Sequence, residues 1–316
     1  MLTIINSTIS GNTANAGDGS GVYNTGTGGG SATLTVNNST ISGNNATANG
    51  GGIFSDGTGG AAIMTTTNAT ITNNHSDSDD SAAGDGGGLN LSAGTYKLRN
   101  TIVAGNFKGA ASPTAHEIFG TVDTSANSSN NLIGTVGNGG LSNGVNGNLV
   151  GVANPGLGPL ASNGGPTQTH ALLFGSPAIE AGDNTFSDAV TLTTDQRGAG
   201  FIRKADSADA NTTQTVDIGA FEAQATIEDI TDKTTAEDTQ LMFSFNVGDG
   251  VAPQITSVTA TSSNTTLVPN LPANIAVSGS GSTRTLTINP AANQFGTATI
   301  TVTVNAGSES MQDTFV

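Results

Sequence analysis

The stretch Asn6-Ser-Thr-Ile-Ser-Gly-Asn12 recurs later in the chain as Asn38-Ser-Thr-Ile-Ser-Gly-Asn44. A third copy reads Asn68-Ala-Thr-Ile-Thr-Asn-Asn74, and a looser fourth copy reads Asn100-Thr-Ile-Val-Ala-Gly-Asn106. The central apolar residue of each copy therefore steps by 32, 30 and 32 residues, from Ile9 to Ile41, Ile71 and Val103. A repeat of this length indicates a stack of similar structural units.

Each copy of the motif is preceded by an alternating apolar segment, and each of the first three copies is followed by a glycine-rich segment. In the second repeat these are Leu34 and Val36 before the motif and Gly52-Ile-Phe54 after it. Successive side chains of a strand point to opposite faces. The pattern predicts three short strands in each unit of about 31 residues, with Tyr23 and Phe54 packed in the interior.

Stacking explains how such short strands bury an apolar core. One coil cannot cover its own apolar side chains, whereas a stack of coils can. Ile9, Ile41, Ile71 and Val103 then form one interior column. Connections between parallel strands are almost always right-handed. We therefore predict an all-β fold, a right-handed parallel β-helix with a C-terminal cap.

Asparagines recur in step with the apolar column. Asparagine tolerates the left-handed backbone conformation of turns, and stacked asparagines hydrogen-bond along a column. We predict a structural role for both asparagine columns, which are Asn6, Asn38, Asn68 and Asn100, and Asn12, Asn44, Asn74 and Asn106.

The composition limits what this chain binds. It carries 8 Lys+Arg against 24 Asp+Glu, a formal net charge of −16. Such a charge repels nucleic acid and anionic membrane surfaces. The chain has no cysteine, which excludes a disulfide scaffold. It contains no apolar run of ~18 residues, so we predict no membrane span.

The motif NSTISGN followed by GGGI resembles the pectate-lyase-like right-handed β-helix repeats of bacterial surface proteins. The resemblance covers residues 1–135. That superfamily contains polysaccharide lyases and hydrolases as well as non-catalytic adhesins, so the fold alone does not decide the function.

Residues 136–222 resemble the choice-of-anchor Q domain of exported bacterial proteins, which we expect to form the cap. Several motifs carry the resemblance in order, and the first of them lies just before this range. They are Asn131-Leu-Ile-Gly134, Asn154-Pro-Gly-Leu-Gly-Pro-Leu160, Asn163-Gly-Gly-Pro-Thr-Gln-Thr-His-Ala-Leu-Leu173, Gly175-Ser-Pro-Ala-Ile-Glu-Ala-Gly-Asp183, Thr194-Asp-Gln-Arg-Gly198 and Asp217-Ile-Gly-Ala-Phe-Glu222.

Residues 223–316 return to the two-residue alternation of strands, as in Leu241-Met-Phe-Ser-Phe-Asn-Val247 and Thr297-Ala-Thr-Ile-Thr-Val-Thr-Val304. This pattern predicts an immunoglobulin-like or cadherin-like β-sandwich. The stretches AEDTQLMFSF and ATSSNTTLVPN resemble the tandem immunoglobulin-like repeats of bacterial adhesins. Repeat sequence follows Met1 directly, and Val316 ends within an expected strand. We therefore interpret the chain as a fragment whose signal peptide and anchor lie outside it.

A catalytic site is the first alternative to a purely structural protein. A polysaccharide lyase needs a basic proton acceptor near acidic groups that hold calcium. Lys97 and Arg99 are the candidate catalytic residues, and a nearby acidic segment contains Asp77, Asp79, Asp80 and Asp85. The competing interpretation is a solvated acidic loop beside a surface strand, which we favour.

Carboxylates gather at two further places. Asp195, Arg197, Asp217 and Glu222 are expected to form a buried ion-pair network with a structural role. Calcium is the one cofactor that the sequence suggests, because carboxylates at a domain boundary bind calcium and stiffen a linker. The candidate ligands are Glu222, Glu228, Asp229, Glu237 and Asp238.

A row of outward hydroxyls suggests a minor alternative. Thr8 and Ser10, Thr40 and Ser42, and Thr70 and Thr72 would lie on one flat face, as in ice-binding β-helices.

The function we predict is that of a non-catalytic adhesin-type protein, located outside the cell or on the surface of a bacterium. Its expected partners are cell-surface glycans or neighbouring surface proteins. The first alternative is a polysaccharide lyase or glycoside hydrolase.

Overall fold

A computed structural model describes residues 1–80, 84–173, 175–189, 191–205, 214–225, 227–248, 255–306 and 309–316. The chain forms two compact units. The first contains residues 1–205 and 214–222, and the second contains residues 223–316.

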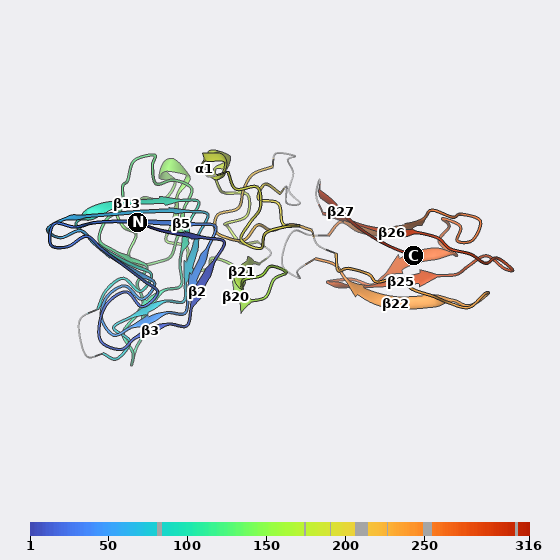
Figure 1. Ribbon diagram of the computed structural model, residues 1–316, viewed down its shortest axis with the longest axis horizontal. Coiled ribbons are helices and arrows are strands. Elements are labelled where there is room, and N and C mark those ends of the chain that lie inside the picture. The colour runs from blue at the N-terminus through green and yellow to red at the C-terminus, as the bar shows by residue number, and fades with distance from the viewer. Residues whose placement is uncertain are drawn as a thin grey trace. The chain divides into compact units, whose positions relative to one another are not determined.

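The first unit is a parallel β-helix, which confirms the predicted fold class (Figure 1). The first sheet contains β1 (Leu2–Ile5), β5 (Ser31–Asn37), β9 (Ala61–Thr67) and β13 (Gly94–Arg99). The second contains β2 (Thr8–Ser10), β6 (Thr40–Ser42), β10 (Thr70–Thr72), β14 (Ile102–Val103), β18 (Leu132–Ile133) and β19 (Leu149–Val150). The third contains β3 (Thr13–Ala14), β7 (Asn45–Ala46), β11 (His75–Ser76), β15 (Phe107–Lys108) and the antiparallel β16 (Thr114–Ala115). The fourth contains β4 (Val22–Thr25), β8 (Ile53–Asp56), β12 (Leu89–Ser92) and β17 (Ile118–Phe119).

Each complete coil thus contributes four strands, and the prediction of three strands per unit is wrong. The additional strand is the short third one, such as β7, which has only two residues. Two residues carry no visible alternation, so sequence periodicity does not reveal a strand of this length. The parallel stack also continues past residue 135, because β19 pairs with β18.

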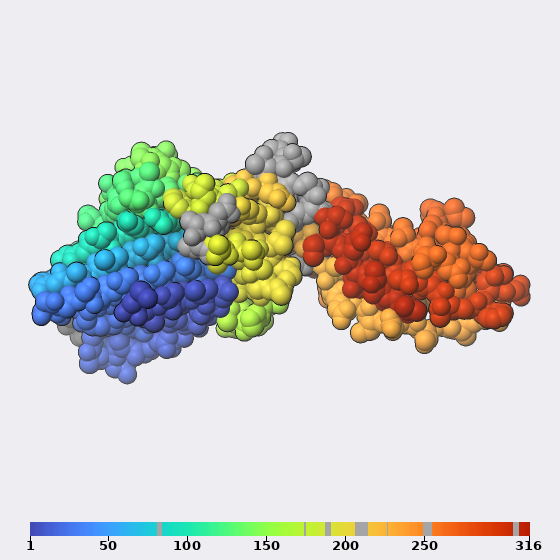
Figure 2. Space-filling view, turned by 45° about the horizontal axis from the view of Figure 1, so that its top comes forward, coloured from blue at the N-terminus to red at the C-terminus, as the bar shows by residue number. Residues whose placement is uncertain are grey.

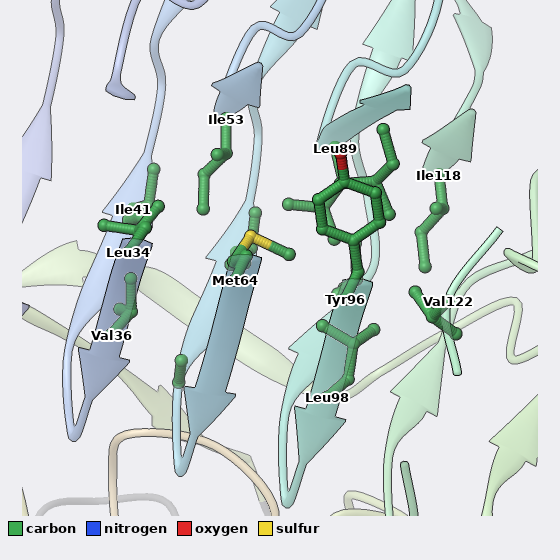
Figure 3. Close-up of a cluster of buried hydrophobic side chains, with 14 of the residues drawn as sticks. Leu34, Val36, Ile41, Ile53, Met64, Leu89, Tyr96, Leu98, Ile118 and Val122 are labelled. Atoms are coloured by element: carbon green, nitrogen blue, oxygen red, sulfur yellow. The ribbon is translucent and has the colours of Figure 1, made fainter. Parts of the chain in front are cut away.

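The interior of the helix is filled by columns of apolar side chains (Figure 3). The register places Ile9 opposite Ile41, Ile41 opposite Ile71, and Ile71 opposite Val103. A second column runs through Leu34, Met64 and Tyr96. The side chains of this interior make one continuous core, because each rung covers the apolar surface of the rung before it.

The two asparagine columns serve different purposes. Asn6, Asn38, Asn68 and Asn100 all have a positive φ, between 47° and 51°, and form the turn between the first and second sheets. The second column forms a ladder along the helix axis. The side-chain amide of Asn44 donates to Asn74 Oδ1 at 2.9 Å, and that of Asn74 donates to Asn106 Oδ1 at 3.0 Å. We call this column the asparagine ladder.

The asparagine ladder requires glycine beside it. Gly21, Gly52 and Gly88 occupy equivalent positions just before the fourth sheet. A Cβ atom at Gly52 would lie 2.5 Å from the carbonyl oxygen of Gly88 and 3.1 Å from the amide nitrogen of Asn74. Any larger residue at these positions would push against the ladder.

Glu117 ends the asparagine ladder. It occupies the position that Gly88 has one rung earlier, since Leu89 N donates to the Glu117 carbonyl. Its carboxylate accepts hydrogen bonds from the backbone N–H and the side-chain amide of Asn106, at 2.9 and 2.8 Å, and from Gly105 N–H at 3.1 Å. The carboxylate therefore takes the place of the next asparagine oxygen.

The described residues between 154 and 222, which follow the helix, pack along the outer face of the second sheet. They contain the antiparallel pair β20 (Leu157–Ala161) and β21 (Thr169–Leu172), and the short helix α1 (Asn184–Ala189); a 3-10 turn (Val145–Gly147) precedes them. Figure 1 shows β20 and β21 beside β2, and Figure 2 shows this segment in yellow against the blue rungs. Of the segment expected to cap the helix, residues 136–222, the described part from 154 onward thus covers a side face, and we call this part the lateral segment.

The second unit consists of two three-stranded antiparallel sheets. One contains β22 (Leu241–Asn246), β25 (Thr283–Ile288) and β24 (Ile275–Ser278). The other contains β23 (Ser257–Ser262), β26 (Ile300–Ala306) and β27 (Glu309–Phe315). Phe245 and Leu286 from the first sheet share one buried core with Val302 and Phe315 from the second. The two sheets therefore pack as layers.

Candidate functional site

The outer face of the fourth sheet carries a row of four side chains, three of them aromatic and one an asparagine. The register aligns Tyr23 with Phe54, Phe54 with Asn90, and Asn90 with Phe119. Their neighbours Val22, Ile53, Leu89 and Ile118 belong to the interior core. Strand alternation therefore directs these four side chains outward, and we call them the aromatic row.

The aromatic row is accessible at both ends. Tyr23 is 55% exposed and Phe119 is 46% exposed, whereas Phe54 and Asn90 are buried. The rings of Tyr23 and Phe54 stack with centroids 5.2 Å apart and planes 12° from parallel. The prediction that both rings are buried is wrong for Tyr23 and confirmed for Phe54, although Phe54 lies on the outer face and outside the interior cluster that contains Ile53. The exposed Tyr23 ring, supported from behind by Phe54, can stack against the C–H face of a sugar.

The predicted catalytic residues do not form a site with the acidic segment. Lys97 and Arg99 lie on β13 in the first sheet. The Arg99 Nε donates to the Asn127 carbonyl at 3.2 Å, and its guanidinium lies over the Phe186 ring at 5.0 Å. Arg99 is therefore held in structural contacts on the outside of the helix.

The acidic segment belongs to the connection between the third and fourth sheets, away from β13 (Figure 1). The Asp80 carboxylate accepts backbone N–H groups of Ala110 and Ala111 at 2.6 and 2.7 Å. Asp85 forms an ion pair with Lys108 at 2.7 Å. Asp77 and Asp79 lie in the same connection. Asp80 and Asp85 thus bind the backbone after β15 and the Lys108 side chain, respectively, whereas a lyase site would need such carboxylates close to Lys97.

The candidate calcium ligands are distributed over both units. Glu222 belongs to the first unit, where it is fully buried. The other four belong to the second unit, where Glu228 accepts from the Asn246 amide and Asp238 accepts from Asn293 N–H. Asp229 and Glu237 are exposed. Among the residues that the structure describes, no group of three or more His, Cys, Asp or Glu is placed to hold a metal ion.

The structure brings Asp195, Arg197, Asp217 and Glu222 into one buried cluster inside the lateral segment. Arg197 pairs with the Asp195 carboxylate at 2.7 Å, and the guanidinium is sandwiched between the rings of Phe201 and Phe221, 3.9 and 3.7 Å from their centroids. Such burial leaves a substrate no access to these charges.

Arg203 is a member of this cluster that sequence reasoning missed. It is fully buried, its Nε lies 3.5 Å from the Glu222 carboxylate, and it donates to the carbonyls of Asp217 and Gly219. Burial raises the pKa of Glu222 well above its ordinary value, and the neighbouring Asp217 raises it further, while Arg203 opposes the shift. The two guanidinium groups of the cluster donate to the backbone carbonyls of Glu222, Asp217 and Gly219 within the lateral segment.

We expect Arg197→Lys to lower the free energy of unfolding of the first unit by about 2 kcal/mol, because lysine has no planar group to fill the space between two rings or to bond Asp195 twice. Urea unfolding followed by tyrosine fluorescence checks this, because Tyr23 and Tyr96 are the two tyrosines, the chain has no tryptophan, and both tyrosines lie in this unit. Arg284→Lys in the second unit serves as the control. An unchanged unfolding midpoint for Arg197→Lys would contradict the structural role.

The hydroxyl rows of the second sheet are covered by the lateral segment. Thr40 and Ser42 are buried, and their hydroxyls bond Gln196 at 2.6 Å and the His170 Nε2 at 2.8 Å. The Thr70 hydroxyl accepts Ala220 N–H at 3.0 Å. The flat exposed face that ice binding requires is therefore occupied by the protein itself.

The fold and these contacts define the protein as a parallel β-helix with an aromatic row that is exposed at both ends and a covered second sheet. No family model, no curated protein and no solved structure matches the chain. In the part of the chain that the structure describes, no helix is both long and apolar enough to cross a membrane.

Proposed function

We propose that this protein is a non-catalytic attachment protein of a bacterial surface, and that its β-helix contacts glycans through the aromatic row. The observation that carries the proposal is the exposed Tyr23 ring stacked on Phe54. Aromatic residues make up only 4% of the chain, and an outward ring gains nothing from the core. A ring held flat in this way offers a rigid surface at low entropic cost.

The remaining parts of the chain are consistent with attachment. The sequence motifs of the lateral segment resemble a choice-of-anchor Q domain, and the second unit has the layered antiparallel sheets that an immunoglobulin-like module would have. We accordingly propose an extracellular location, with the second unit as a stalk. Calcium binding by the carboxylates between Glu222 and Asp238 stays a prediction.

A polysaccharide lyase or hydrolase is the less favoured alternative. It would need a base and acidic groups around one substrate position. Lys97 and Arg99 lie in the first sheet, and the acidic segment lies in the connection from the third sheet to the fourth. This separation favours binding without turnover.

Glycan-array binding tests the proposal directly. We expect the full chain to bind at least one class of polysaccharide, and Tyr23→Ala to weaken that binding about tenfold, the loss expected for one stacked ring. Phe107→Ala is the matched control, because Phe107 is an exposed ring on the third sheet, outside the aromatic row.

Two results would contradict this function. One is equal binding by wild type and Tyr23→Ala. The other is release of unsaturated products from a uronate polymer that disappears in Lys97→Ala, which would place a lyase site on β13.

A further inference from the structure

One end of the aromatic row is flanked by charged groups. Phe119 stacks with His116 at 6.5 Å between ring centroids and 29° between planes. His116 Nε2 lies 3.6 Å from the Asp85 carboxylate, which pairs with Lys108 Nζ at 2.7 Å. The side chains of Lys108 and Asp85 are 39% and 28% exposed. We call Asp85, Lys108, His116 and Phe119 the Phe119 corner.

The backbone fixes the geometry of this corner. His116 Nδ1 accepts Gly86 N–H at 2.9 Å, so the hydrogen of the neutral ring lies on Nε2, toward Asp85. Burial lowers the pKa of His116 and Lys108 lowers it further, while Asp85 opposes the shift. Asn90 donates from its side chain to the Asp85 carbonyl at 3.1 Å. The Asp85 carboxylate is thus held beside the His116 ring, and the exposed Phe119 ring stacks against that ring.

We propose that the Phe119 corner is a subsite for a neutral pyranose sugar, an inference that rests on the proposed glycan-binding function. The Phe119 ring takes the C–H face of the sugar. One hydroxyl donates to Asp85, and the adjacent hydroxyl accepts from Lys108. An acceptor and a cationic donor side by side match a pair of neighbouring hydroxyls, because each hydroxyl can donate and accept.

The charges of the corner select against acidic sugars. Asp85 and Lys108 neutralise each other within the corner, whereas the chain as a whole carries a net charge of −16. A uronate would have to displace Asp85 from Lys108 and enter a negative field, which costs free energy. A neutral sugar bridges the ion pair without breaking it.

The aromatic row also sets the direction in which a bound oligosaccharide would run. Tyr23 and Phe119 are separated by three steps between neighbouring strands, or roughly 14 Å. A chain of several sugars along the helix axis therefore reaches both exposed rings, whereas a monosaccharide contacts one of them.

Calorimetry with the full chain tests the subsite. The probes are cellohexaose, mannohexaose and xylohexaose as neutral chains, and hexagalacturonate as the acidic one. We expect a neutral hexamer to bind, Phe119→Ala to weaken it about tenfold, and Asp85→Asn and Lys108→Met to weaken it about fivefold each. Phe107→Ala and Asp56→Asn are matched controls outside the corner and should stay within about twofold of wild type.

The outcomes separate this subsite from the general function. Binding that needs Tyr23 but is unchanged in the corner variants would overturn the subsite and leave glycan binding in place. Tighter binding of hexagalacturonate than of every neutral hexamer would also overturn it. Absence of binding to every probe and on the array would overturn both proposals. Tyrosine fluorescence of each variant shows whether the first unit is still folded.

Discussion

Replacing Asn74 with alanine is expected to lower the free energy of unfolding of the β-helix unit by about 4 kcal/mol. Asn74 lies in the middle of the asparagine ladder and is fully buried. Its side-chain oxygen accepts both the backbone N–H and the amide of Asn44, and its own amide donates to the Ile41 carbonyl and to Asn106. Alanine leaves these buried groups without partners, and each such group costs about 1–3 kcal/mol.

Asn12→Ala provides the comparison, since Asn12 is exposed at the end of the same ladder. Water replaces its lost partners, so we expect a loss of only about 1 kcal/mol. Asn15→Ala, on the exposed loop after β3, should change nothing. Urea unfolding followed by tyrosine fluorescence measures all three variants. Equal losses for Asn74→Ala and Asn12→Ala would show that the ladder is not a buried network.

The second large effect is a pH dependence carried by Glu117. Burial raises the pKa of Glu117 from its ordinary value of 4.5 to about 7, although hydrogen bonds from Asn106 and Gly105 oppose the shift. The folded state then binds more protons than the unfolded state between these two values. The contribution of Glu117 to the free energy of unfolding is therefore fully present below pH 4.5 and is lost as the pH rises through 7. The shift corresponds to about 3 kcal/mol.

Glu117→Gln isolates this contribution, because glutamine does not titrate. We expect the stability of the variant relative to wild type to rise by about 3 kcal/mol between pH 4 and pH 8. Glu222 adds a slope of the same sign to both proteins, which cancels in the comparison. Glu237→Gln, an exposed glutamate of the second unit, controls for the loss of one charge. Parallel pH curves for Glu117→Gln and wild type would exclude a buried titrating carboxyl at the end of the ladder.

The repeat was enough to predict the parallel stack, because identical spacing means identical environments. A step of 30 or 32 residues returns the chain to the same place on the next rung, so Ile9, Ile41 and Ile71 share one column. The same argument failed for short elements. The two-residue strands of the third sheet have too few side chains for an alternation to show, and the count of strands per coil was therefore too low.

The candidate site was only partly visible in the sequence. The sequence alone predicts an interior position for Tyr23 and Phe54, since apolar rings favour burial in general. The Phe119 corner was missed, because Asp85 and Lys108 lie 23 positions apart and meet only when two rungs stack. One feature of the repeat does indicate that the surroundings change near this corner. The column of Gly21, Gly52 and Gly88 continues as Glu117, and a change from glycine to a carboxylate in a repeat marks a position where the environment changes.

The sequence by itself determined the stacked β-helix, since local alternation and a repeat length of 30 to 32 residues decide which side chains face inward on every rung. Tertiary structure alone decided what covers the outside. The lateral segment lies on the second sheet because His170, Gln196 and Ala220 meet hydroxyls more than a hundred positions away in the chain. Such contacts depend on three-dimensional shape, which periodicity does not encode. On the fourth sheet, which the lateral segment does not cover, Tyr23 and Phe119 at the two ends of the aromatic row stay exposed.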